Sequence, residues 1–159
     1  MTTSETLVKM ILDRWHASVK NCDTILNALP DENFQKEIAP GKNRGIYLLG
    51  HLVAVHDDMI RLLGLGEKMY PHMEEPFLKM PDKAAAEIPT VEVLKACWST
   101  QCATLQQLFN GFQAKDWFQK HTAVSDEDFA AEPHRNKLNI VLTRTTHLAW
   151  HTGQLILLK

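Results

Sequence analysis

The sequence has few cysteines, and they are not arranged for pairing. Its 159 residues include three, Cys22, Cys97 and Cys102, and no C-x-x-C pair. An odd number of cysteines without such a pair argues against a disulfide framework and favours a reducing compartment. We therefore expect three small buried thiols in a cytoplasmic protein.

An excess of one charge and long apolar runs are also lacking. Lysine and arginine number 17 and aspartate and glutamate 19, with the basic residues scattered along the chain. A nucleic-acid-binding domain usually shows a basic patch or stripe. No apolar run approaches the roughly 20 residues of a membrane span. The start, Met-Thr-Thr-Ser-Glu, lacks the features of a signal peptide. We expect neither a nucleic-acid partner nor a membrane association.

The catalytic motifs that can be recognised directly in a sequence are absent as well. There is no glycine-rich phosphate loop, no nucleophile elbow and no H-E-x-x-H pair. The sequence therefore assigns no catalytic residue and no organic-cofactor motif.

What the sequence does contain is helical periodicity. Four long segments place apolar residues at helical spacing, and no segment alternates convincingly as a strand would. They span residues 2–29, 44–63, 90–110 and 136–159. Thr2 with Glu5 has the spacing of a capping box, and Asn43 is a candidate cap of the helix that begins near residue 44. We predict a single all-α domain over residues 1–159, a four-helix bundle.

Two irregular segments interrupt the helices. Residues 67–89 contain four prolines and several large apolar side chains, and residues 112–135 contain an acidic run and a proline. A long loop in a compact domain is often functional. The apolar content of residues 67–89 predicts that this segment packs down over another part of the protein, with a short helix near residues 81–86.

Three histidines fall on two of the predicted helices. His147 and His151 are four residues apart in one of them, so they lie on one face, and His51 lies in the most apolar helix. If the two faces meet, three neutral imidazoles can bind one divalent metal and leave a coordination position open. The alternative is that all three are polar core residues with satisfied hydrogen bonds.

Neighbouring polar residues are candidates for supporting roles. His56 is a poor fourth ligand, because five residues separate it from His51 and turn it about 140° away. His72 lies in the irregular segment and is a candidate for the mouth of the site. Asp57 and Asp58 are candidates to orient an imidazole. The remaining candidates are Arg144 and Gln154, which flank the histidines, and Gly153, whose lack of a side chain suggests close approach of another helix or subunit.

These motifs resemble the DinB-like superfamily, also called the DinB/YfiT group. The matching pieces are Pro40-Gly-Lys-Asn-Arg-Gly-Ile-Tyr-Leu-Leu-Gly-His51, the start of a helix at Pro89-Thr90, and His147-Leu-Ala-Trp-His151-Thr-Gly-Gln-Leu. The resemblance implies an up-down-down-up four-helix bundle, usually a homodimer, with a divalent metal on His51, His147 and His151. Members often carry a further histidine directly before the last ligand, where this chain has Trp150.

The resemblance leaves the reaction open. Some relatives are similar to thiol S-transferases that use a low-molecular-weight thiol, others to thiol-dependent isomerases. We therefore expect a metal-dependent enzyme, with zinc or nickel as the metal, that transfers a thiol to a small electrophile. The alternatives are a helical bundle that binds a ligand or partner without catalysis, and a hydrolase that uses metal-activated water.

Overall fold

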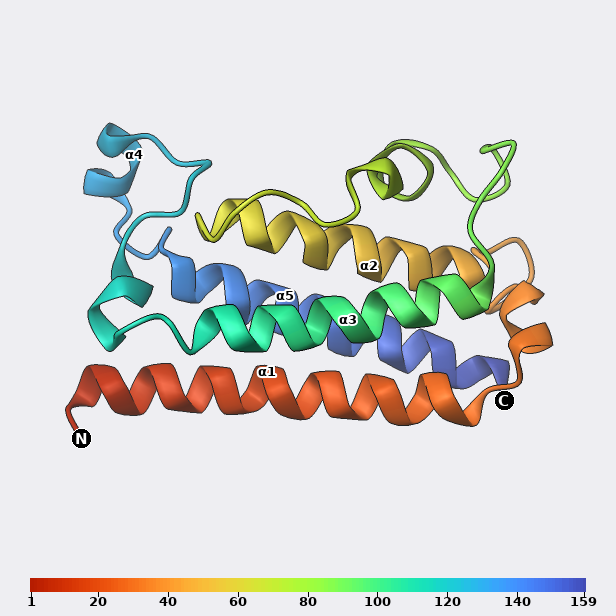
Figure 1. The fold of residues 1–159 in the computed structure, drawn as a ribbon, viewed down its shortest axis with the longest axis horizontal. Coiled ribbons are helices and arrows are strands. Elements are labelled where there is room, and N and C mark those ends of the chain that lie inside the picture. The colour runs from red at the N-terminus through yellow and green to blue at the C-terminus, as the bar shows by residue number, and fades with distance from the viewer.

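The computed structural model describes residues 1–159 and consists of helices joined by loops (Figure 1). Four helices are long: α1 (Thr3–Ala28), α2 (Gly45–Leu62), α3 (Val91–Phe109) and α5 (Lys137–Leu155). The shorter helical pieces are η1 (Asp31–Gln35), η2 (Pro71–Met73), η3 (Glu75–Lys79), η4 (Ala114–Phe118), α4 (Asp126–Ala131) and η5 (Ile156–Leu158). The prediction of an all-helical fold is confirmed, and none of these helices is long and apolar enough to cross a membrane.

Three of the long helices begin where the sequence predicts. Thr2 and Glu5 form the capping box of α1, with the Glu5 backbone N–H donating to the Thr2 hydroxyl at 3.2 Å. Thr90 caps α3 and Asn136 caps α5 through the same kind of side-chain acceptor. Each cap satisfies a backbone N–H that the helix itself leaves without a partner.

The start of α2 differs from the prediction that Asn43 caps it. The cap residue is Arg44, and its backbone N–H donates at 2.8 Å to the carboxylate of Asp82, 38 residues later. The Arg44 guanidinium donates to the same carboxylate at 2.7 Å. Helix α2 therefore begins without a side-chain cap, and Asp82 from a distant loop holds Arg44 in place.

The long helices lie side by side around one core (Figure 1). Helix α5 packs against both α1 and α2, and α2 packs against α3. Between α1 and α3, the ring of Trp15 meets Phe109 edge-on, and the Trp98 indole N–H donates to Asp23 at 2.7 Å. The chain runs from left to right in Figure 1 along α1 and α5, and from right to left along α2 and α3.

Helix α2 is buried along most of its length. Its outer side is covered by the segment from Gly64 to Met80, which packs down as the sequence predicts. The expected short helix at residues 81–86 was wrong, because turns occupy those positions and the helical pieces η2 and η3 come earlier. Asp57 on α2 holds the segment by accepting the backbone N–H groups of Met69 and Tyr70, each at 2.8 Å.

Candidate metal centre

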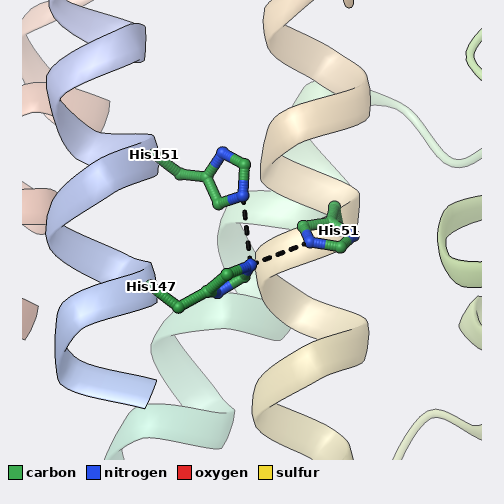
Figure 2. Close-up of side chains that lie close together, drawn as sticks. All are labelled: His51, His147 and His151. Atoms are coloured by element: carbon green, nitrogen blue, oxygen red, sulfur yellow. Dashed lines mark hydrogen bonds between the residues drawn. The ribbon is translucent and has the colours of Figure 1, made fainter. Parts of the chain in front are cut away.

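The structure brings the three predicted histidines together. His51 projects from α2, and His147 and His151 project from adjacent turns of α5 (Figure 2). The Nε2 atom of His147 lies 3.1 Å from the Nε2 of His51 and 3.1 Å from that of His151. All three candidate ligand atoms lie within 4.8 Å of one another, and all three residues are half-buried.

In two of these histidines, the outer ring nitrogen, which is the Nδ1 that faces away from the cluster, is hydrogen-bonded to an acceptor. The Nδ1–H of His51 donates to the backbone carbonyl of Phe77 at 3.0 Å, and the Nδ1–H of His151 donates to the carboxamide oxygen of Gln154 at 2.6 Å. In a neutral imidazole only one nitrogen carries hydrogen. Both contacts therefore direct the Nε2 lone pairs of His51 and His151 toward the centre of the cluster.

Burial favours the neutral form of His147 and His151. Burial, followed by the proximity of His151, His51 and Arg144, lowers the pKa of His147 to about 4. Burial also lowers the pKa of His151, and the hydrogen bond with Gln154 opposes this shift. Neutral imidazole is the form that binds metal.

The donor set fits a divalent cation. One hydrogen on His147 Nε2 cannot point along both of its 3.1 Å contacts, so without a cation at least one of them is not a proper hydrogen bond. Two nitrogens bound at 2.0–2.1 Å to one tetrahedral metal would lie about 3.3–3.4 Å apart. The observed separations of 3.1 Å are close to this value. Three nitrogen ligands from two helices also leave room for a further ligand.

Tyr47 supports the position of His51. The ring of Tyr47, one turn earlier on α2, stacks on the His51 ring with centroids 6.4 Å apart, and its hydroxyl donates to the Met80 carbonyl at 2.7 Å. Tyr47 also lines a cavity of about 470 Å³ together with Arg44, Pro76 and Asp82, and none of the three histidines is among its lining residues. No sequence pattern indicated the Phe77 carbonyl, because any residue presents the same backbone acceptor.

Gly50 allows Phe77 to approach α2. A Cβ placed on Gly50 would lie 2.3–2.5 Å from three atoms of the buried Phe77 ring. We expect Gly50→Ala to displace this ring and its carbonyl, to destabilise the protein by about 1–3 kcal/mol, and to weaken zinc binding roughly tenfold through His51. Chemical denaturation and zinc titration measure both effects.

Gly153 is the matched control for that substitution. The structure places nothing within 4 Å of a Cβ at Gly153, so the chain itself gives no close approach there. Gly153→Ala should stabilise α5 by up to about 1 kcal/mol through helix propensity. Equal stability of the Gly50 and Gly153 variants would contradict the role assigned to Gly50.

The other polar candidates lie elsewhere. His56 is fully buried on the side of α2 that faces α3, with its ring 4.8 Å from that of Trp98. His72 is exposed in η2 and does not belong to the cluster. Neither aspartate orients an imidazole: Asp57 holds the segment that covers α2, and Asp58 pairs with Arg61 and Lys68. Gln154, rather than an aspartate, holds His151.

The buried His56 predicts a pH dependence of stability. Burial lowers its pKa to about 3, whereas an unfolded histidine titrates near 6.5. The unfolded state therefore binds more protons below pH 6.5, and stability falls as the pH drops from 6.5 toward 3. For the metal-free protein, we expect the free energy of unfolding to fall by about 1.4 kcal/mol per pH unit for each such histidine.

Between pH 6.5 and 4.5, the free energy of unfolding of His56→Met should therefore fall less steeply than that of the wild type, by about 1.4 kcal/mol per pH unit. Urea denaturation at a series of pH values measures the effect. Above pH 7 the slopes of the wild type and the variant should coincide, since there both states of His56 are neutral. Parallel slopes below pH 6.5 would show that His56 is not a buried neutral group.

Comparison with known proteins agrees with the fold. A family model described as the DinB superfamily matches residues 14–155. A crystal structure of a conserved protein from Enterococcus faecalis is similar with a TM-score of 0.64 at 15% sequence identity, covering 98% of this chain and 94% of that one. This likeness concerns the fold alone. No curated protein matches significantly. Because the family model spans most of the chain, the protein belongs to the DinB superfamily.

Proposed function

We propose that His51, His147 and His151 bind a divalent metal ion, zinc or nickel, and that the protein is a metal-dependent enzyme. The observation that carries the proposal is the convergence of three imidazole nitrogens, two of which have their outer nitrogens held by acceptors. Borderline divalent metals prefer imidazole ligands. The fourth position would be available to a water or a substrate.

Metal analysis of the protein purified without a histidine tag tests the proposal. We expect close to one equivalent of zinc or nickel per chain, either as purified or after addition of the metal. Fewer than about 0.1 equivalents, with no binding of added zinc or nickel, would reject the site.

As the reaction we propose thiol S-transfer to a small electrophile. The thiol sulfur would form a bond to an electrophilic carbon, the leaving group would depart with its electron pair, and the thiol proton would pass to solvent. A divalent cation in the site supplies Lewis acidity that deprotonates a bound thiol. The histidines hold that centre, and the cavity beside Tyr47 has the size of a small-molecule site.

Two alternatives predict different results. A non-catalytic bundle would bind its ligand equally well after His147→Ala and would change only in stability. A metal-dependent hydrolase would act without any added thiol. A panel of electrophiles, assayed with and without low-molecular-weight thiols, separates these alternatives from the transferase.

We also propose a single domain with an up-down-down-up bundle and a homodimer. The opposite directions of the long helices in Figure 1 support the bundle. For the dimer, the support is a shallow apolar groove between α1 and α5, where Leu7, Met10 and Leu142 are exposed. A two-fold interface would use the same patch on both copies. We expect a native mass of twice 18.1 kDa, reduced to one chain by Leu142→Glu.

A further inference from the structure

Arg144 is a half-buried cation without a partner in the protein. Its Nε atom is fully buried and donates no hydrogen bond, and its guanidinium forms no ion pair. Arg44 pairs with Asp82 at 2.7 Å, Arg61 with Asp58 at 2.9 Å, and Arg135 with Glu132 at 3.2 Å. Arg14 forms no ion pair, but its side chain is exposed to solvent. A buried charge is usually paired or hydrogen-bonded, because an unpaired one loses its hydration without compensation.

The position of Arg144 links it to the histidine cluster. It lies on α5 one turn before His147 and two turns before His151, and residues at these spacings share a helix face. The positive charge of Arg144 is close enough to lower the pKa of His147. The helix spacing therefore places Arg144 on the face of α5 that carries His147 and His151.

The nearest negative charge does not neutralise Arg144. Asp58 on α2 favours the charged form of Arg144, but burial dominates and lowers the pKa of the guanidinium. Asp58 is engaged by Arg61 at 2.9 Å and by Lys68 at 3.3 Å. A divalent cation on three neutral imidazoles would add further positive charge beside Arg144. Such a site lacks an anion.

We propose that Arg144 binds a carboxylate group of the ligand that occupies the open side of the three-histidine site. The inference rests on the proposed function and narrows its substrate class to small electrophiles that carry a carboxylate. A guanidinium presents a planar fork of N–H donors that matches a carboxylate, and such charge-assisted pairs are strong. The two terminal guanidinium nitrogens, which unlike Nε are not buried, have no partner in the protein and can supply the two donors of a bidentate contact.

Titration with acetate, and with the neutral analogue acetamide, tests the inference. Binding is measured by calorimetry on the zinc-loaded and the metal-free protein, and by the ¹⁵N resonance of the Arg144 Nε–H group. We expect this resonance to shift with acetate and not with acetamide. Arg144→Gln should weaken acetate binding about tenfold or more, and Arg144→Lys should give an intermediate loss because it keeps the charge without the fork.

Arg135→Gln is the matched control, since it removes the same charge from an arginine that is paired with Glu132. It should bind acetate as the wild type does. Circular dichroism and zinc stoichiometry verify that each variant is folded and binds metal. Equal acetate affinity in the wild type and Arg144→Gln would overturn the assignment of Arg144. A wild type that binds acetate through Arg144 but takes up no zinc would support the carboxylate site and reject the metal site alone.

Discussion

Replacing His147 with alanine is expected to lower zinc affinity by at least about 100-fold. Loss of a residue that only orients a ligand typically lowers metal affinity by about 10–100-fold, and His147 would be a ligand itself. His147 is the shared member of the cluster, since its Nε2 makes both 3.1 Å contacts. The variant would retain His51 and His151, whose rings meet edge-on with centroids 5.1 Å apart. Two imidazoles on separate helices form a much weaker site than three.

Calorimetry and thermal denaturation with added zinc measure the loss. Zinc at 100 times its dissociation constant should stabilise the wild type by about 2.7 kcal/mol, and the same concentration should stabilise His147→Ala by no more than about 0.4 kcal/mol. His72→Ala is the control, because His72 is exposed and lies outside the cluster. Zinc binding by His147→Ala at the wild-type level would contradict the ligand set.

The three histidines could be predicted as a cluster because each is marked by its own neighbours in the sequence. His147 and His151 share a helix face at a fixed spacing, and the long apolar pattern around His51 indicated a central helix. The atoms that orient these imidazoles could not be predicted in the same way. The Phe77 carbonyl is a backbone group in an irregular segment, and its approach depends on the absence of a side chain at Gly50.

The helix starts also divide into those set by neighbouring residues and one that depends on a distant residue. Thr2, Thr90 and Asn136 cap the helices that directly follow them, so their roles can be inferred from a few neighbouring residues. The start of α2 depends on Asp82, which reaches Arg44 only after the intervening chain has folded back. Local propensity favoured Asn43, and a stronger ion pair from a distant residue replaced it.

Asp57 is the residue of α2 for which sequence and structure differ most. The prediction placed it near the imidazoles, whereas its carboxylate is buried and accepts three hydrogen bonds away from them. Two come from the backbone N–H groups of Met69 and Tyr70 at 2.8 Å, and one from the Gln101 carboxamide at 3.0 Å. These contacts attach the irregular segment to both α2 and α3.

Asp57→Ala is therefore expected to destabilise the protein by about 3–5 kcal/mol, because it removes three charge-assisted bonds and leaves their donors without an acceptor. Asp57→Asn should cost less, since its amide retains one oxygen. The neighbouring Asp58→Ala is the control: its carboxylate pairs with side chains near the surface, so the loss should stay within about 1 kcal/mol. Urea denaturation measures all three.

Asp57→Ala should also lower the zinc affinity of the three-histidine site. The segment that Asp57 anchors at Met69 and Tyr70 continues to Phe77, whose carbonyl holds His51. Loosening the anchor would free the Nδ1–H of His51 and reduce zinc affinity, while His147 and His151 remain in place on α5. If Asp57→Ala lowered stability and left zinc affinity unchanged, residues nearer to Phe77, such as Tyr47 through its bond to Met80, would hold that carbonyl independently of the anchor.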